Sequence, residues 1–123
     1  MNFILITNNE QVLKRFKDKV EISYKNVSCR EILVEARDLI HKGCSLETHP
    51  LSGSIKPNEN PFKSILLSRK SGAVDLDSLV IIENSIATFD KFSCEFSKLS
   101  DEMLCDFRLL DLTLIESALT CII

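Results

Sequence analysis

Three patterns of apolar and polar positions predict the strands of this chain. Residues 3–6 and the core of 64–68 are short, continuous apolar runs, and polar residues bound each of them. Such runs are typical of strands that are covered on both faces, as in parallel sheets. Residues 20–24 instead alternate between apolar and polar side chains, which predicts a half-covered strand at an edge of the sheet.

The clearest helical signal lies between residues 28 and 42. Ser28 and Glu31 form a capping box, in which the Ser28 hydroxyl accepts from the Glu31 N–H and the Glu31 carboxylate reaches back. Apolar residues then recur at helical spacing, and Gly43 follows at the position where a left-handed terminator is expected. We therefore expect a helix over 28–42.

Three further helices are predicted. The first is short, is capped by Asn8 or Asn9 and runs through Phe16. The second runs from Asp75 or Asp77 to near Leu99, and its apolar stripe contains Leu79, Ile82, Ile86, Phe89 and Phe96. The third runs from Ser100 almost to Ile123. The order of elements predicts a single small α/β domain over 1–123. Its sheet is expected to be mainly parallel and three-stranded, in the order 2-1-3, with helices on both sides and a C-terminal helical pair. This order places a topological switch point near Thr7, Asn8 and Asn9.

The periodicity stops between Cys44 and Lys63, a stretch that holds all three prolines. A loop this long in a small domain is usually functional or disordered. Leu51, Ile55 and Phe62 can anchor it, so we expect an ordered loop. Its hydroxyl, amide, imidazole and ammonium groups can converge on an oxyanion such as phosphate, sulfate or carboxylate. The predicted ligand-binding residues are His49, Ser52, Gly53, Ser54, Lys56, Asn58, Lys63 and Ser64.

Composition narrows the classes of protein. The chain has 123 residues, a net charge of -3 and 45% hydrophobic residues, which excludes a disordered chain. A pI near 5.4 gives no overall basic surface for nucleic acid. No apolar stretch approaches the length of a membrane span, and the N-terminus lacks the features of a secretory signal. The five cysteines include no CxxC pair, so we expect reduced thiols and a cytoplasmic protein.

Catalytic signatures are missing: the chain has no GxGxxG, Walker A, GxSxG or HExxH sequence. His41, Cys44 and His49, with Glu47 and Glu59 nearby, have the donor types that zinc accepts but not the spacing of known sites, so neither a metal nor a cofactor is predicted. A nucleophilic pair of Cys44 with a histidine is also considered, but the sequence shows no base or cleft for it. The other cysteines are expected to act as small hydrophobic residues on helices.

The last helix contains one anomaly. Asp111 falls on its apolar face among Leu104, Phe107, Ala118 and Ile122, and a buried carboxylate is costly unless it is paired. Arg108, three residues back, is the expected structural partner; in the alternative, Asp111 reaches a loop group such as Lys56. Leu109 and Leu112 place apolar atoms beyond this face, which predicts a homodimer through residues 100–123.

The middle of the chain resembles a known family. Residues 39–43, 48–54 and 56–58, with Pro61, Lys63 and Ser64, are similar to the signature of the GrdX family, and the resemblance extends over essentially the whole chain. Members of that family are encoded beside the selenium-dependent glycine, sarcosine and betaine reductases of amino-acid-fermenting anaerobes. The resemblance implies a metabolic setting and reductase components as partners, but no mechanism.

Three hypotheses follow from the sequence. The first is a non-catalytic accessory protein whose 49–64 loop binds an anionic small molecule or a partner protein. The second is a small enzyme for a phosphorylated or carboxylated metabolite, in which His49 is the acid or base, Lys56 holds the anion, and Ser52 or Ser54 donates hydrogen bonds. The third is a structural subunit held together through its last helix.

Overall fold

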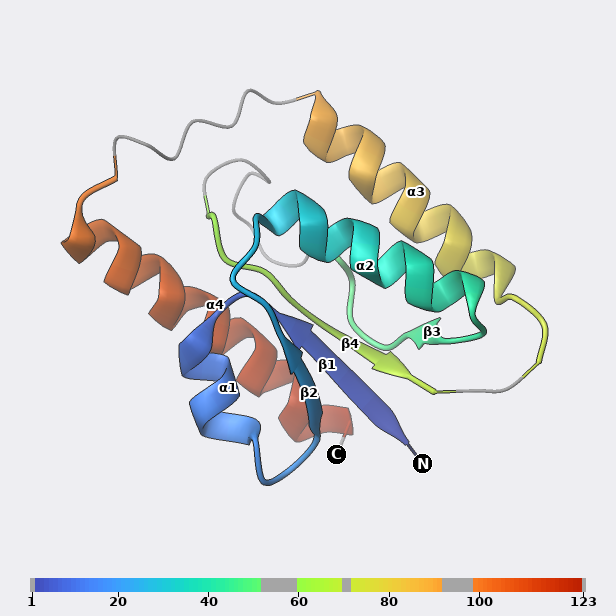
Figure 1. The fold of residues 1–123 in the computed structure, drawn as a ribbon, viewed down its shortest axis with the longest axis horizontal. Coiled ribbons are helices and arrows are strands. Elements are labelled where there is room, and N and C mark those ends of the chain that lie inside the picture. The colour runs from blue at the N-terminus through green and yellow to red at the C-terminus, as the bar shows by residue number, and fades with distance from the viewer. Residues whose placement is uncertain (1, 52–59, 70–71, 92–98, 123) are drawn as a thin grey trace.

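The structure is a computed structural model that describes residues 2–51, 60–69, 72–91 and 99–122. Its centre is a four-stranded sheet in the order β2-β1-β4-β3 (Figure 1). The strands are β1 (Phe3–Thr7), β2 (Glu21–Tyr24), β3 (Ser45–Leu46) and β4 (Ser64–Ser68). β1 pairs parallel with β2, whereas β4 runs antiparallel to both β1 and β3.

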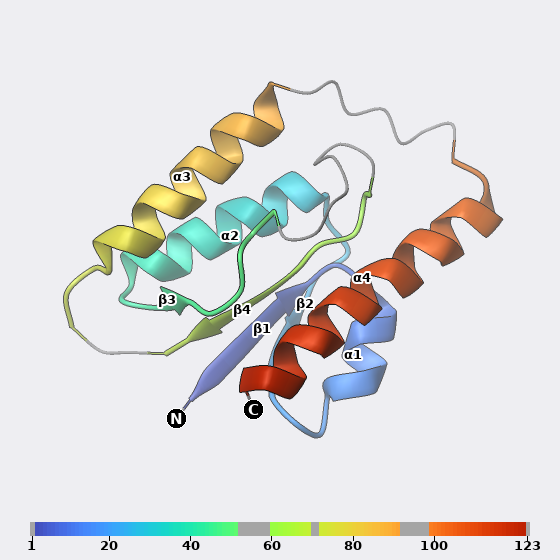
Figure 2. The same ribbon diagram turned by 180° about the vertical axis from the view of Figure 1, so that it is seen from behind.

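Two pairs of helices cover the two faces of the sheet, as Figures 1 and 2 show. α2 (Cys29–His41) and α3 (Leu76–Asp90) lie on one face and form a core with Ile4, Ile6, Ile65 and Leu67. α1 (Glu10–Phe16) and α4 (Asp101–Ile122) lie on the other face against Leu5 and Leu66. This arrangement explains why the central strands read as continuous apolar runs, because both of their faces are buried.

The predicted ends of α2 are confirmed. Ser28 Oγ accepts a 3.2 Å hydrogen bond from the Glu31 N–H, and the same hydroxyl donates to Glu31 Oε1 at 3.3 Å. At the other end, Gly43 has a φ of 107°, and the amides of Gly43 and Cys44 donate to the carbonyls of Ile40 and Leu39. These two bonds form a Schellman motif, which satisfies the last carbonyls of the helix.

The expected sheet needs two corrections. It is mixed rather than mainly parallel, because β4 runs antiparallel to β1, and it has a fourth strand, β3, inside the stretch that was predicted to be all loop. The antiparallel direction is possible because the connection from α2 returns through β3 and the following segment before the chain enters β4. A two-residue strand carries too little periodicity to be detected in the sequence.

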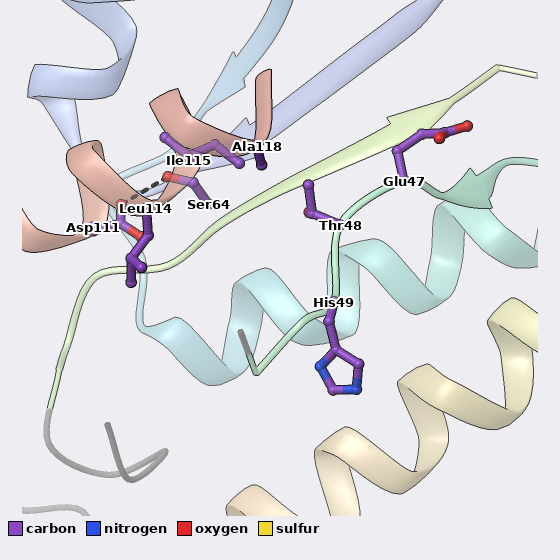
Figure 3. A pocket seen from close by; sticks show the side chains of 8 residues that line it. All are labelled: Glu47, Thr48, His49, Ser64, Asp111, Leu114, Ile115 and Ala118. Atoms are coloured by element: carbon purple, nitrogen blue, oxygen red, sulfur yellow. Dashed lines mark hydrogen bonds between the residues drawn. The ribbon is translucent and has the colours of Figure 1, made fainter. Parts of the chain in front are cut away.

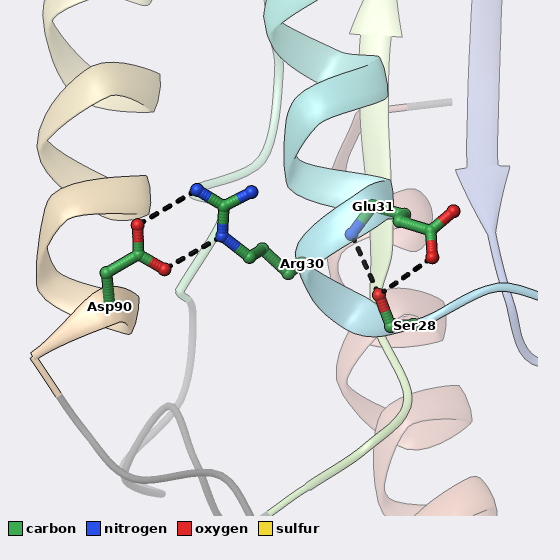
Figure 4. Close-up of polar contacts among 4 residues, drawn as sticks. All are labelled: Ser28, Arg30, Glu31 and Asp90. Atoms are coloured by element: carbon green, nitrogen blue, oxygen red, sulfur yellow. Dashed lines mark hydrogen bonds and ion pairs between the residues drawn. The ribbon is translucent and has the colours of Figure 1, made fainter.

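The C-terminal helices also differ from expectation. α3 ends at Asp90 rather than near Leu99, and residues 92–98, including Phe96, lie outside the described residues. Asp90, the last residue of α3, pairs with Arg30 in the first turn of α2 (Figure 4). Because packing against α2 stabilises α3, the helix ends beside the start of α2. α3 and α4 do not form a packed pair, because they belong to the cores on opposite faces of the sheet.

The buried side of α4 is shifted from the predicted face. Ile115 and Leu119 are buried beside Asp111, whereas Leu104, Phe107 and Ala118 are only half-buried. In the described part of the chain, no helix combines the length and the apolar character needed to cross a membrane.

Candidate functional site

The candidate site lies where β1 ends and β4 begins. Because these strands are antiparallel, the last residue of β1, Thr7, pairs directly with the first residue of β4, Ser64. Thr7, Asn8 and Asn9 follow one another here and are all buried. Asn9 also caps α1, because its Oδ1 accepts a 3.1 Å hydrogen bond from the Gln11 N–H.

Asn8 fixes the segment that leads into β4. Its Nδ2 donates to the carbonyl of Pro61 at 3.0 Å and to that of Val27 at 2.9 Å, and its Oδ1 accepts from the Lys63 N–H at 2.8 Å. One side chain therefore holds the end of the predicted binding loop against β1 and the start of α2.

A closed ring of hydrogen bonds connects β1, β4, α1 and α4. The Asn9 N–H donates to Thr7 Oγ1 at 3.0 Å, and Thr7 Oγ1 lies 2.7 Å from Ser64 Oγ. Ser64 Oγ donates to Asp111 Oδ2 at 2.8 Å, so the Thr7 hydroxyl supplies the proton of the bond to Ser64. Asn9 Nδ2 closes the ring by donating to the same Asp111 oxygen at 3.1 Å.

Burial dominates the electrostatics of Asp111. Desolvation raises the pKa of its carboxyl, and the hydrogen bonds from Asn9 and Ser64 and the charge of Lys63 lower it only in part. The ring therefore places a proton-binding group on α4 at the ends of two central strands.

Lys63 is the cation of this region. Burial lowers the pKa of its ammonium group, while the neighbouring Asp111 and Cys29 oppose this effect. Lys63 is in none of the ion pairs of the described residues. These pairs are Arg15 with Glu116, Lys25 with Glu35, Arg30 with Asp90, Arg37 with Glu83, and Arg69 with Glu21. Among the described residues, the Asp111 carboxylate therefore favours the charged form of Lys63 without forming a direct ion pair with it.

A cavity of about 190 Å³ lies beside the ring, between α4 and residues 47–49 (Figure 3). Its lining residues are Glu47, Thr48, His49, Ser64, Asp111, Leu114, Ile115 and Ala118. Thr48 fixes one wall to the sheet, because its Oγ1 accepts from the Leu66 N–H at 3.0 Å. In Figure 3, Ser64 and Asp111 point toward one another at one end of the cavity, and the side chain of Glu47 points away from them.

His49 does not join the Asp111–Ser64 pair. Its side chain is exposed, and its ring points away from the pair in Figure 3. Its Nδ1 accepts a 3.0 Å hydrogen bond from the Leu51 N–H, which occupies that nitrogen in a local turn.

The structure brings together part of the predicted ligand-binding set. Ser64 is in the ring, Lys63 is beside it, and His49 is at the outer wall of the cavity. The other predicted residues, Ser52, Gly53, Ser54, Lys56 and Asn58, lie outside the described residues.

The structural partner predicted for Asp111 is wrong. Arg108 forms no ion pair with it; the side-chain partners of Asp111 are Asn9 and Ser64. The Arg108 guanidinium instead stacks over the Phe62 ring, with Cζ 4.8 Å from the ring centroid, and its buried Nε has no hydrogen-bond partner. Helix spacing places Arg108 and Asp111 on the same face, which is why a pair was predicted. The guanidinium packs on the Phe62 ring instead of on the Asp111 carboxylate.

The positions of Cys44 and His41 do not support the other two sites considered in the sequence, a cysteine nucleophile and a metal site. Cys44 is buried in the core on the α2 side and does not line the cavity, and His41 is exposed in the last turn of α2. The described residues contain no group of three or more potential metal ligands. Of the remaining described cysteines, Cys29 is buried as expected, whereas Cys105 and Cys121 are exposed on α4.

Sequence reasoning did not assign Thr7 and Asn9 to the site. The sequence holds two signals for this contact. Three polar residues, Thr7, Asn8 and Asn9, follow a buried strand directly, and the Asp111 carboxylate falls on an apolar helix face. Their link to Asp111 spans about a hundred positions, and no local pattern encodes such a contact.

Comparison with known proteins gives one match. A family model described as GrdX-like protein matches residues 4–120, nearly the whole chain. No curated protein and no solved structure matches it. The match includes all or most of each element of the fold and every described residue of the site, and the chain therefore belongs to the GrdX-like protein family.

Proposed function

We propose that this GrdX-like protein is a non-catalytic, cytoplasmic accessory protein of anaerobic glycine, sarcosine and betaine reductase metabolism. In this proposal, residues 49–64 bind an anionic small molecule or a partner protein, including a reductase component. The family assignment supports the metabolic setting.

The single observation that carries the binding proposal is Lys63. Burial lowers the pKa of the Lys63 ammonium group, no direct ion pair of the described residues includes it, and a bound anion offsets the cost of burying its charge. The group also lies at the end of the predicted loop, where Ser52, Ser54 and Lys56 supply further hydroxyl and ammonium groups by sequence.

The fixed ends of this segment support the same proposal. Thr48 holds the chain before it to β4, and Asn8 and Asn60 hold the chain after it; Asn60 Nδ2 donates to the Phe107 carbonyl of α4 at 3.2 Å. Fixed ends lower the entropic cost of binding at a segment between them.

The enzyme alternative receives less support. A general acid or base must reach its substrate together with the groups that position it. His49 is exposed, points away from Asp111 and Ser64, and uses Nδ1 in a local turn. We therefore favour binding over catalysis.

A thermal-shift screen at fixed protein concentration tests the proposal. It includes phosphate, acetyl phosphate, nucleotides, glycine, sarcosine and betaine. A ligand that binds only the folded state at a hundred times its Kd stabilises the protein by about 2.7 kcal/mol. We expect an anion to raise Tm in the wild type and to lose this effect in Lys63→Met and Lys56→Ala.

Lys17→Met is the matched control, because it removes the charge of one exposed lysine at the C-cap of α1, which is the opposite end of that helix from Asn9. An anion effect that survives Lys63→Met and Lys56→Ala contradicts the proposed site. If no small molecule raises Tm, purified reductase components are tested next with the same variants. Full binding of a component by both lysine variants excludes the proposed segment.

A further inference from the structure

The cavity beside the hydrogen-bonded ring carries chemistry that differs from anion binding. Three residues of α4, Leu114, Ile115 and Ala118, form an apolar wall, and the Asp111–Ser64 pair forms a polar end. A small cavity with apolar walls and a few convergent polar groups is the usual form of a ligand site.

Asp111 forms no direct ion pair among the described residues, although the charge of the neighbouring Lys63 acts on it. Only 7% of its surface is exposed. Both of its side-chain hydrogen bonds go to Oδ2, and the backbone N–H of Ser64 is a further donor to the carboxylate. A carboxylate in this state favours a cationic hydrogen-bond donor over any other group.

We propose that this cavity binds a small primary amine. The ammonium N–H groups donate to Asp111 Oδ1 and to the remaining lone pair of Ser64 Oγ, while a short alkyl chain contacts Leu114, Ile115 and Ala118. The Asp111 carboxylate supplies the charge, and the apolar wall supplies the burial.

The lining residues discriminate between cations. A quaternary ammonium group cannot donate a hydrogen bond and is usually bound by aromatic side chains. Among the described residues that line the cavity, the only aromatic ring is the His49 imidazole, which points away from Asp111. The cavity therefore favours an ammonium group with N–H donors over a quaternary one.

Its size limits the ligand. A volume of about 190 Å³ corresponds to about six water molecules at about 30 Å³ each. Amines with about four or five non-hydrogen atoms fit this volume. Propylammonium is thus a suitable probe.

This site differs from the anion site proposed at Lys63, because Lys63 does not line the cavity, although the charges of Asp111 and Lys63 act on one another. Ala118→Leu changes the cavity alone, and Lys56→Ala changes the predicted loop alone. Loss of amine binding in the first variant and loss of anion binding in the second therefore test the two proposals separately.

The experiment measures Tm and binding heat at about pH 8, where an alkylamine remains protonated. Wild-type protein is titrated with propylammonium chloride and with tetramethylammonium chloride, at an ionic strength held constant with sodium chloride. We expect a saturable rise in Tm with propylammonium and none with tetramethylammonium. Equal responses to the two cations, or no response to propylammonium, overturn the proposal.

Two variants locate the site. Asp111→Asn removes the charge and should weaken propylammonium binding at least about tenfold. Ala118→Leu fills the cavity, leaves Asp111 in place and should abolish binding, so it tests the site even if Asp111→Asn does not fold. Asp106→Asn is the matched control, because Asp106 is an exposed carboxylate on the same helix. Unchanged binding in Ala118→Leu, or equal losses in Asp106→Asn and Asp111→Asn, overturns the proposal.

Discussion

At the scale of single residues, Asp111 determines how α4 contacts the sheet. It is the buried polar member of a stripe that otherwise contains Ile115 and Leu119. Asn9 and Ser64 satisfy its carboxylate from α1 and β4, so that the position of the helix along the sheet depends on directional bonds as well as on apolar packing.

Asp111 should make the stability of the protein depend on pH. Because burial raises the pKa of Asp111, the folded chain binds more protons than the unfolded chain from about pH 4 up to the folded pKa. The contribution of Asp111 to the free energy of unfolding therefore falls as the pH rises through this window. Relative to Asp111→Asn, the wild type should lose stability over this range in urea denaturation.

The neighbouring charge of Lys63 enters this comparison. Lys63 is present in both proteins, and its pKa and that of Asp111 depend on one another, so the difference reports Asp111 together with its coupling to Lys63. A difference that grows in favour of the wild type as the pH rises would mean that pairing, and not burial, dominates at Asp111.

Ser64 should contribute more to the free energy of unfolding than an ordinary buried serine does. Ser64→Ala removes the donor to Asp111 and the acceptor of the Thr7 hydroxyl, and leaves both groups buried. We expect the free energy of unfolding to fall by about 1–3 kcal/mol. The matched control is Ser68→Ala in the same strand, whose hydroxyl makes one 3.5 Å contact and whose loss should cost under about 1 kcal/mol. Equal costs would refute a special role for the ring.

At the scale of elements, the ends of α2 follow directly from local sequence. The capping box at Ser28 and the left-handed Gly43 act within a few residues, and for this reason the sequence predicts them well. The direction of β4 is different. An apolar run buried on both faces has the same pattern in a parallel and in an antiparallel strand, so the pattern cannot distinguish the two.

The candidate site also has one part that the local sequence predicts and another part that it does not. Asp111 is detected because a carboxylate on an apolar face breaks a local pattern, but its partners lie on α1 and β4, far away in sequence. The predicted partner, Arg108, satisfies the spacing on the helix and fails because Phe62 offers its guanidinium a stacking surface.

The cap of α2 gives a prediction at this scale. Ser28→Ala removes the acceptor of the Glu31 N–H and should lower the free energy of unfolding by about 1 kcal/mol. Ser28→Asp, which retains an acceptor, should keep most of the wild-type stability in the same denaturation assay. Equal losses in both variants would show that the hydroxyl acts in another way.

At the scale of the whole molecule, α4 leaves apolar surface uncovered. Leu109 is 57% exposed on this helix, whereas Leu112 packs into the core. We propose that the chain forms a homodimer through α4, because this helix exposes two large apolar side chains, Met103 and Leu109, and subunit contacts cover exposed apolar surface.

Sedimentation velocity tests the dimer. Leu109→Lys should shift the protein from dimer to monomer at the same concentration, since a lysine charge in an apolar interface is strongly unfavourable. Val80→Lys, which changes a 58% exposed residue on α3, should leave the dimer intact. A monomeric wild type, or dissociation by Val80→Lys alone, contradicts the assignment to α4.

The proposed binding surface of this GrdX-like protein is formed by residues 49–64. A two-dimensional amide NMR titration of the whole chain with phosphate, acetyl phosphate and purified reductase components tests it. We expect shift changes concentrated in residues 47–64 and at Asn8, and their loss in Lys63→Met but not in Lys17→Met. Changes confined to α3 or to the exposed side of α4, or equal changes in both lysine variants, would contradict it.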